Sequence, residues 1–276
     1  MVATPLGNLA DITLRALDTL RSVHLIAAED TRHTRKLLSH YDIHKPLVSY
    51  HCQNARERGR GLVARMHEGQ DIALVTDAGT PGISDPGALL VHQAIEEGLP
   101  VTVIPGPTAS IAALVVSGLP THPFAFLGFP PSRGSGRRHF FSAYAALSMT
   151  LILYESPQRL QRTLEDILLH WGNRRIAVAR EITKRFEELF RGTVAEAKDH
   201  YSPGARGELT LVIEGVGMKE ETVDADFTWQ LELGQLLRKS GMTVKEAANE
   251  IAQRYQVPRR VVYQEALKLK EPGHCE

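Results

Sequence analysis

Short apolar runs, many of them rich in β-branched residues, recur along this chain between amphipathic segments. The alternation is typical of an α/β architecture and predicts sheets that are largely parallel. Residues 158–170 show the clearest helical pattern, with an apolar stripe that begins at Leu160 and Leu164. The expected strands are residues 23–28, 47–50, 72–76, 101–104, 124–128, 151–154, 176–179 and 209–213.

The alternation changes at two places, and these define the expected domains. An alanine- and valine-rich helix stops at Gly118 and Pro120, so we place one boundary near residue 120. From Asp224 onward only helical patterns remain. The chain therefore divides into an α/β domain at 1–120, a second α/β domain at 121–220 and a small helical unit at 224–276.

The C-terminal unit contains three expected helices, the first over residues 227–238. Thr243 and Glu246 form a T-x-x-E capping box for the second helix, and Pro258 opens the third, over residues 259–270. This order is typical of a helix-turn-helix unit that binds nucleic acid through Arg259 and Arg260. The alternative is that three small helices merely pack on the main body. The expected apolar face of the second helix is Val244, Ala247, Ala248, Ile251 and Tyr255.

Composition narrows the class of protein. Lysine plus arginine equals aspartate plus glutamate at 32 each in 276 residues, so any basic surface must be local. The cysteines, Cys52 and Cys275, form no C-x-x-C, which argues against a disulfide framework or a thiolate metal site. No apolar run reaches transmembrane length, and no basic segment followed by an apolar one marks a signal peptide. We expect a cytoplasmic protein with no membrane partner.

Three glycine- and proline-containing turns indicate a small-molecule site. ATPLGN starts at Ala3, DAGTPG starts at Asp77 and PGPTAS starts at Pro105, and the last two follow expected strands directly. Ligands of open parallel sheets bind at the carboxyl edge, where glycine lets them approach the backbone. Tight turns alone are the alternative, but three on one edge favour a site. The second turn continues beyond DAGTPG to Gly87, and in this continuation Ser84 or Asp85 is expected to cap a helix.

Charged residues crowd three strand ends. Asp30 precedes a helical segment and could simply cap it, yet Glu29 and Arg32 beside it put two acids and a base on one rim. Glu155 ends another strand, one turn before Arg159. The third group is Arg180, Glu181, Lys184 and Glu187. Because solvated charge clusters usually lie on helix exteriors, these positions favour a site.

Two further features are weaker. The basic, glycine-rich segment 130–138, which contains Arg137 and Arg138, is either a linker or an arm that binds phosphates. His40 and His44 are four residues apart, but no further ligand is evident, so we expect no metal.

Several segments, in order, closely resemble the ribosomal RNA small-subunit methyltransferase I family of the tetrapyrrole methylase superfamily. They are VATPLGNLADITLRAL, AAEDTRHTRKLL, VTDAGTPGISDPG, PGPTAS, YESPQRL, AREITKRFEE and GELTLVIEG, and the helical C-terminal unit is also similar. The resemblance implies a kidney-shaped pair of α/β domains that binds S-adenosylmethionine in the cleft between them, usually as a homodimer. Family members usually carry a few residues before VATP that form the first strand, and here Met1 stands there.

The resemblance also implies a substrate and donor contacts. The substrate is the decoding-centre cytidine of 16S rRNA that also receives an N4-methyl group, and methyl transfer to its ribose 2′-oxygen would take place on the assembled small subunit. Pro5, Ala78, Gly79, Thr80, Ile83, Thr108 and Ala109 match the donor-binding motifs, with Glu155 and Leu209 flanking the adenosine.

For the reaction, one carboxylate among Asp30, Asp77, Glu155 and Glu181 is expected to take the proton or to orient the group that does. We expect Arg32, Arg159, Arg180 and Lys184 to hold phosphates, and Arg137, Arg138, Arg259 and Arg260 to contact RNA. The alternatives are a superfamily methylase acting on a tetrapyrrole or diphthine, and a non-catalytic S-adenosylmethionine sensor that binds RNA.

Overall fold

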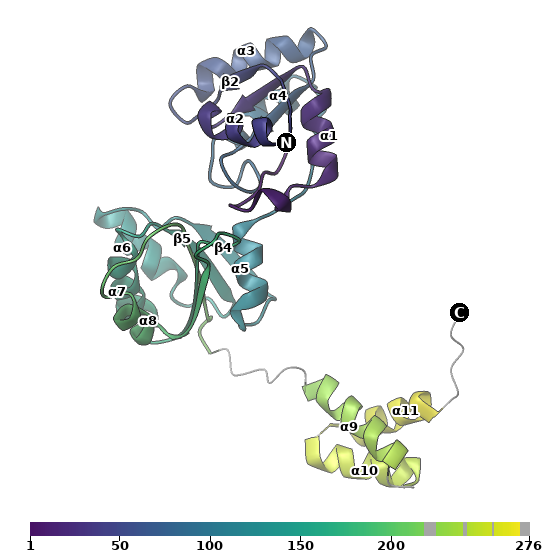
Figure 1. Cartoon of the computed structure of the whole chain (residues 1–276). Coiled ribbons are helices and arrows are strands. Elements are labelled where there is room, and N and C mark those ends of the chain that lie inside the picture. The colour runs from purple at the N-terminus through teal and green to yellow at the C-terminus, as the bar shows by residue number, and fades with distance from the viewer. Residues whose placement is uncertain (218–224, 240–241, 256, 271–276) are drawn as a thin grey trace. The chain divides into compact units, whose positions relative to one another are not determined.

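The computed structural model describes residues 1–217, 225–239, 242–255 and 257–270 (Figure 1). The chain forms two compact units, Met1–Gly217 and Met218–Glu276. The first unit contains two sheets with helices packed on them, and the second contains helices alone among its described residues. The α/β class and the helical C-terminal region are therefore confirmed, while a boundary near residue 120 stays a prediction.

The first sheet has the strand order β2-β1-β3, and both strand pairs are parallel. Its strands are β1 (Leu25–Ala28), β2 (Leu47–Ser49) and β3 (Ile72–Val75). Parallel neighbours need crossover connections, and here helices supply them. The helical elements of this part are η1 (Leu9–Asp11), α1 (Leu14–Ser22), α2 (Thr31–His40), α3 (Ala55–His67) and α4 (Gly87–Glu96).

The expected strand at residues 101–104 was wrong. Only Ile104 pairs there, in an isolated parallel bridge with Val2. Val2 also donates its backbone N–H to the carbonyl oxygen of Leu74 at 2.9 Å. Residues 101–104 thus lie near the edge of the first sheet. They form no ladder of paired residues, because Val2 alone pairs with Ile104 there.

The second sheet has the strand order β4-β5-β8-β6-β7. Only β4 and β5 are parallel, and the other three pairs are antiparallel, so the expectation of largely parallel sheets fails here. Strand β7 was not expected at all, because none of the predicted strands lies between residues 179 and 209. The strands are β4 (Phe124–Gly128), β5 (Thr150–Glu155), β6 (Arg175–Arg180), β7 (Glu188–Thr193) and β8 (Leu209–Ile213).

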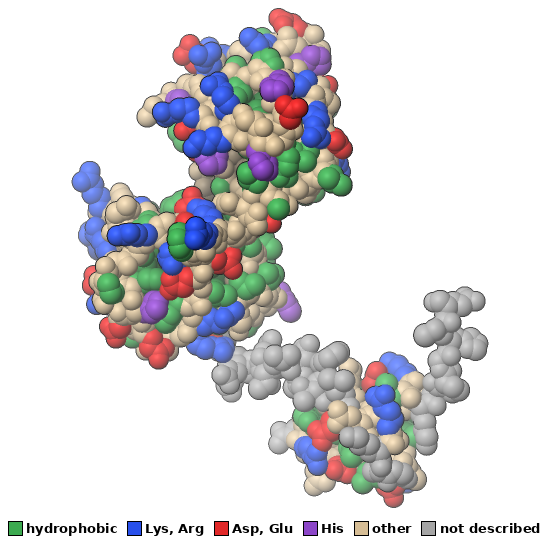
Figure 2. Space-filling model, in the orientation of Figure 1, with side chains coloured by type: hydrophobic (Ala, Val, Ile, Leu, Met, Phe, Trp, Pro, Cys, Tyr) green, Lys and Arg blue, Asp and Glu red, His purple; other side chains and the backbone are tan. Residues whose placement is uncertain are grey.

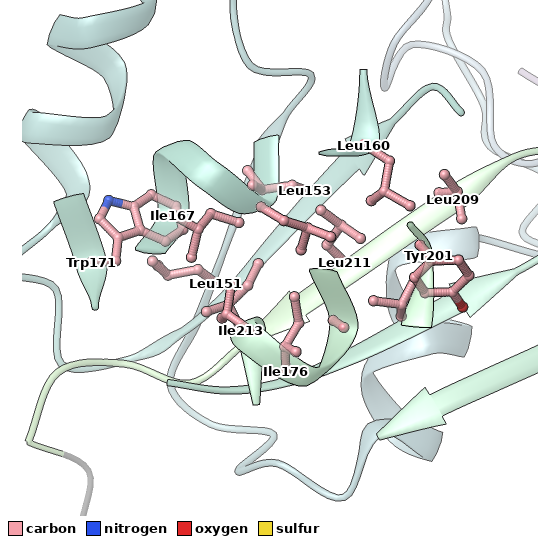
Figure 3. Packing of buried hydrophobic residues seen from close by; sticks show 14 of the residues in the cluster. Leu151, Leu153, Leu160, Ile167, Trp171, Ile176, Tyr201, Leu209, Leu211 and Ile213 are labelled. Carbon is pink, nitrogen blue, oxygen red and sulfur yellow. The ribbon is translucent and has the colours of Figure 1, made fainter. Parts of the chain in front are cut away.

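Helices cover both faces of the second sheet. On one face, Leu151, Leu211 and Ile213 pack against Ile167 and Trp171, and Figure 3 shows these side chains meeting between the strands and a helix. On the other face, α5 (Ala109–Ser117) buries Ala113 and Leu114 against β5, β6 and β8. The remaining helices are α6 (Gly134–Tyr144), α7 (Leu160–Trp171) and α8 (Val194–His200).

The loop between β6 and β7 has an unusual backbone. Glu181 and Thr183 have φ values of 53° and 67°, a region that residues other than glycine rarely occupy. Gly207 makes room for this loop, because a Cβ atom there would lie 2.3 Å from the Glu181 carboxyl carbon. The conformation is therefore tied to a glycine in the loop that directly precedes β8.

The C-terminal unit has its three helices where the sequence predicts them: α9 (Ala225–Lys239), α10 (Val244–Tyr255) and α11 (Arg259–Lys270). The capping box is present, since Glu246 donates its N–H to the Thr243 hydroxyl and accepts from the Thr243 N–H. Ala247, Ala248 and Ile251 are buried against α9 and α11 residues, as expected. No helix in the described part of the chain is long and apolar enough to cross a bilayer.

The packing of β8 generates a stability prediction. Leu211→Ala should lower the free energy of unfolding by about 2–5 kcal/mol, because Leu211 is fully buried and the cavity left behind cannot fill. Leu169→Ala is the matched control: that side chain is 77 % exposed on α7, so its loss should change stability by less than about 0.5 kcal/mol. Urea denaturation followed by circular dichroism measures both. Equal midpoints for the two variants would contradict the packing described here.

Candidate functional site

A cavity of about 430 Å³ lies where the two sheets of the first unit meet. Its walls come from the carboxyl ends of β3 and β5 and from the start of β8, which pairs with the end of β5. Ligand sites of open α/β sheets occupy this edge. Its lining residues are Leu6, Glu29, Thr76, Asp77, Ala78, Gly79, Thr80, Ile83, Ser84, Asp85, Thr108, Ala109, Phe129, Tyr154, Glu155, Ser156, Pro157, Gly207, Glu208, Leu209 and Thr210.

Backbone rather than side chains forms one wall of this site cavity. Gly79 has a φ of 82°, and a Cβ atom there would lie 3.1 Å from Leu6 and 3.4 Å from the carbonyl oxygen of Pro107. The Thr80 and Thr108 hydroxyl oxygens lie 2.7 Å apart and join the two loops directly. The wall is therefore a close contact of two turns, and glycine keeps it open to a ligand.

The first turn is attached to the same wall by backbone pairing. Thr4 donates its N–H to the carbonyl oxygen of Gly79 at 2.9 Å, and Gly79 donates its N–H to the carbonyl oxygen of Thr4 at 3.0 Å. The Thr4 hydroxyl also donates to the carbonyl oxygen of Thr76. All three turns that the sequence singled out thus meet at one place.

Asp85 shapes the second half of the long turn. Its carboxylate accepts hydrogen bonds from the N–H groups of Gly82 and Gly87, and Gly87 begins α4. Burial raises the pKa of Asp85, although these N–H donors oppose the shift. The N-cap residue of α4 is Pro86 rather than Ser84 or Asp85, but Asp85 does bind the N–H of the first helical residue.

Three acids, Glu29, Asp30 and Asp77, lie close together beside the backbone wall. Thr76 donates its hydroxyl to Glu29 at 2.6 Å, and the Asp30 N–H donates to Asp77 at 3.1 Å. Burial raises the pKa of Asp77, and the charge of Glu29 adds to that effect. Asp30 instead caps α2 by accepting from the Arg32 N–H, and that bond holds its pKa below the usual range. Glu29 and Asp77 line the cavity, and Asp77 is the one of the three acids whose pKa is raised by burial.

Glu155 is buried in the wall of the site cavity, and both of its carboxylate oxygens have partners. It accepts hydrogen bonds from the Ser156 N–H and the Thr163 hydroxyl, and the Arg159 guanidinium lies 3.1 Å away. Arg137 extends this network, because it donates to Thr163 at 2.9 Å. The arrangement can hold a strand end in place, and it neutralises the one fully buried carboxylate in the wall.

Aromatic side chains complete the wall on the side of the second sheet. The Tyr154 ring lies 4.8 Å from Phe126 and 5.6 Å from Phe129, both edge to face. The Tyr154 hydroxyl accepts a hydrogen bond from the N–H of Ser110, at the start of α5. A half-exposed Phe129 beside Tyr154 gives the cavity a flat apolar surface of the kind that packs against a planar ring.

At the rim, Lys184 joins the two parts of the first unit. Its ammonium group contacts Glu181 at 2.8 Å and Glu208 at 2.9 Å, and its methylene chain lies against Gly7. Burial lowers the pKa of Lys184, but the two carboxylates more than offset this, so the net shift is upward. Burial likewise raises the pKa of Glu181, but the hydrogen bonds from Lys184 and from the Glu208 N–H, together with the charges of Lys184 and Arg180, outweigh it, so that the net shift is downward. Both groups stay charged at neutral pH.

The expected site residues fall into three groups. Ala78, Gly79, Thr80, Ile83, Thr108, Ala109, Leu209, Asp77 and Glu155 line the cavity. Pro5 is buried directly before the lining residue Leu6, and Asp30, Arg32, Glu181 and Lys184 lie outside the lining. Lining residues that were not among the expected site residues include Leu6, Thr76, Phe129, Tyr154, Glu208 and Thr210. Tyr154 is the first residue of the motif YESPQRL and Phe129 directly precedes the segment 130–138, but no spacing rule singles out either ring.

The expected RNA-binding arginines lie in different environments. Arg137 is 2 % exposed and paired with Asp166, Arg159 faces Glu155, and Arg180 faces Glu188. A phosphate would have to compete with these carboxylates. Arg138, Arg259 and Arg260 are exposed.

Charge on the visible face of the first unit is mixed. Figure 2 shows Lys and Arg side chains interspersed with Asp and Glu rather than gathered in a single field. Among the described residues, no cluster of three His, Cys, Asp or Glu side chains could hold a metal ion. Recognition by this unit therefore depends on particular side chains rather than on bulk charge.

A second cavity, of about 550 Å³, opens at the other end of the first sheet. Asp71 and Ile72, at the amino end of β3, line it together with Met1, Leu99 and Val101. No residue of the three glycine-containing turns lines this second cavity. Met1 and Val2, which do line it, directly precede the first turn. The carboxyl edge, where the turns and the acids meet, is the better candidate for chemistry.

Family comparisons agree with this geometry. The profile of Tetrapyrrole (Corrin/Porphyrin) Methylases matches residues 1–198, and that of the RsmI C-terminal HTH domain matches residues 232–270. Among solved structures, uroporphyrin-III-C-methyltransferase from Thermus thermophilus is 22 % identical, with a TM-score of 0.57 over 76 % of this chain and 91 % of that one. A diphthine synthase structure has a TM-score of 0.61 at 15 % identity, over 77 % and 89 %. These structures share the fold.

Much closer relatives cover almost the whole chain. Proteins named Ribosomal RNA small subunit methyltransferase I are 46 % identical in Halalkalibacterium halodurans, over 95 % of this chain and 92 % of the relative, and 45 % identical in Synechocystis sp., over 99 % and 98 %. The protein of that name in Bacillus subtilis is 42 % identical over 98 % and 94 %. With its tetrapyrrole-methylase fold and its helix-turn-helix unit, this chain belongs to the ribosomal RNA small subunit methyltransferase I family.

Proposed function

We propose that this protein transfers a methyl group from S-adenosylmethionine to the ribose 2′-oxygen of the decoding-centre cytidine of 16S rRNA that also carries an N4-methyl group, on the assembled small subunit. The close relatives' name supports an rRNA substrate, and the motif resemblance supports the nucleotide and the atom. The observation that carries the chemistry is the site cavity, whose lining combines a wall of bare backbone with a partly dehydrated acid, Asp77.

The residues present fit S-adenosylmethionine. The cavity volume of about 430 Å³ is within the range of small-molecule sites. Its turns at Gly79 and Thr108 offer backbone groups to the amino-acid part, and Ile83, Phe129 and Leu209 give apolar surface to the adenosine. When bound, the donor supplies a methyl group that its sulfonium charge already activates.

The protein's main task is then alignment. Holding the 2′-oxygen in line with the methyl group supplies up to about 7–11 kcal/mol of the barrier, whereas a positioned base supplies about 10²- to 10⁴-fold in rate. The close contacts among the three turns suit this task, since the wall they form cannot shift without breaking the Thr4–Gly79 pair. Positioning dominates, and proton transfer adds to it.

Among the acids, Asp77 is best placed to take the proton from the 2′-hydroxyl. The Asp30 carboxylate caps α2, and the Glu181 carboxylate binds Lys184. The Glu155 carboxylate is paired with Arg159 in the buried network of the cavity wall. Asp77 lines the cavity without a cationic partner within 4 Å among the described residues, and its raised pKa makes its carboxylate a stronger base. Glu29 fixes the neighbouring Thr76.

The function is tested by radiolabelled methyl transfer to small subunits that lack the modification, with naked 16S rRNA in parallel. We expect label on the subunits, in one cytidine whose phosphodiester bond resists alkaline hydrolysis, because 2′-O-methylation removes the attacking hydroxyl. Label on the base, or on a tetrapyrrole instead, would overturn the proposal. Donor binding without any transfer would favour a sensor of S-adenosylmethionine.

A second prediction concerns Asp77. Asp77→Asn should lower kcat by about 10²- to 10⁴-fold with donor affinity retained. In the wild type, kcat/KM should rise with pH through the raised pKa of Asp77, because the carboxylate form accepts the proton; this rise should vanish in the variant. Asp30→Asn is the control, since asparagine caps a helix as well as aspartate does. Unchanged turnover in Asp77→Asn would exclude Asp77 as the base.

A third prediction concerns the exposed arginines. Arg138, Arg259 and Arg260 are proposed to contact RNA phosphates, so their replacement by alanine should flatten the dependence of log affinity on log salt by about 0.7 to 0.9 per contact. Lysine at the same positions keeps the charge and should keep the slope. An alanine variant with the wild-type slope would contradict these contacts.

We also propose a homodimer. Ile111, Val115 and Val116 on α5 are 44 %, 64 % and 45 % exposed, although the opposite side of this helix is buried in the second sheet. Apolar side chains along the edge of α5 are visible in Figure 2. Such a face is typical of a protein interface. A monomeric mass in sedimentation equilibrium would contradict this.

A further inference from the structure

Phe186 is the most exposed phenylalanine beside the site, and nothing in the methyl-transfer chemistry uses it. It lies in the loop between β6 and β7 and is 67 % exposed. The guanidinium carbon of the neighbouring Arg185 lies 5.6 Å from the centre of the Phe186 ring. Leaving an aromatic ring in water forgoes the free energy of its burial, so a single exposed phenylalanine carries meaning only where its surroundings hold it in place.

The surroundings do hold this loop. Glu181 and Thr183 occupy the left-handed region, which is strained for a β-branched residue such as threonine. The Thr183 N–H donates to the Glu187 carboxylate, and the Glu187 N–H donates to the carbonyl oxygen of Lys184 at 3.1 Å. Strained conformations persist only where neighbouring contacts impose them, and they cluster at functional sites. These contacts hold the part of the loop that carries Phe186 in one conformation.

The same loop is attached to the rim of the site cavity. Glu181 accepts the N–H of Glu208 at 2.9 Å, and Lys184 binds the Glu208 carboxylate. Glu208 lines the cavity, and Gly7, against which Lys184 packs, directly follows the lining residue Leu6. Phe186 therefore stands two residues beyond a lysine that is fixed at the entrance.

Arg185 differs from the other cations of this region. Lys184 and Arg180 have carboxylate partners at 2.8 Å and 2.7 Å. No carboxylate in the described part of the chain lies within 4 Å of the Arg185 guanidinium, and its side chain is exposed. It is thus free to bind a phosphate while it supports one side of the Phe186 ring.

We propose that Phe186 stacks on an unpaired nucleobase of the RNA substrate next to the nucleotide whose ribose enters the site cavity, and that Arg185 contacts the adjoining phosphate. This inference rests on the proposed function. Proteins recognise unpaired RNA by placing bases on aromatic rings and guanidinium planes, and a nucleotide drawn into a cavity leaves its neighbour unstacked. Each such stack changes affinity by about 5- to 100-fold.

The test compares four variants in the full-length protein. Phe186→Ala and Phe186→Leu remove the π face, and the leucine variant keeps most of the apolar surface. Phe186→Trp keeps an aromatic face, and Leu169→Ala removes another largely exposed apolar side chain, on α7. The readouts are Kd for undermethylated small subunits with S-adenosylhomocysteine present, kcat/KM for subunits at saturating donor, donor affinity by calorimetry and mass by sedimentation.

We expect the alanine and leucine variants to bind subunits about 5- to 100-fold more weakly and to lose kcat/KM by a similar factor, with donor affinity and mass unchanged. The tryptophan and Leu169→Ala variants should match the wild type. A leucine variant that binds like the wild type would overturn the stacking role, as would a loss of dimer mass, which would assign Phe186 to a protein interface. Because subunit binding is measured without methyl transfer, a wild type that binds but does not methylate contradicts the proposed function alone.

Discussion

The backbone pair between Thr4 and Gly79 is the constraint on which the candidate site depends. Two hydrogen bonds join the first turn to the second, and the Thr80–Thr108 contact joins the second to the third. A single hydrogen bond typically contributes only about 0.5–1.5 kcal/mol to stability, but here such bonds close three turns from distant parts of the chain around one space. The pairing also explains Gly79: a left-handed residue without Cβ lets the turns approach to van der Waals contact.

Buried charge organises the other half of the site. Glu155 and Arg137 are almost completely buried, and Thr163 connects them. Removing one member of such a network leaves a neighbour charged and unpaired, which costs far more than the net contribution of the intact network. The carbonyl oxygens of Pro130 and Pro131 accept from Arg159 and Arg137, so the network fixes the start of the basic segment as well. Arg137 and Arg159, which the sequence suggested as phosphate or RNA ligands, therefore stabilise the fold through these contacts.

Much of the fold could be predicted from the sequence because local signals and tertiary contacts agree. The capping box at Thr243, the cap at Asp30 and the glycine-containing turns are each specified by a few adjacent residues. The strand pairing of the second sheet could not be predicted, since the period of a strand does not say which neighbour it joins or in which direction. Arg137 shows the same limit: its burial is decided by Asp166 and Thr163, which lie far along the chain. Phe129 and Glu208 reach the cavity for the same reason.

The place of β8 in the second sheet bears on how the protein is made. The first sheet is complete once Val75 has been synthesised, because all three of its strands precede that point. The second sheet cannot close until residues 209–213 emerge, since β8 lies between β5 and β6. Domains generally fold as they leave the ribosome, N-terminal first. A nascent chain of this protein thus carries one finished sheet and two separate strand pairs, β4–β5 and β6–β7, and the wall that Leu209 gives the site cavity is among its last parts to form.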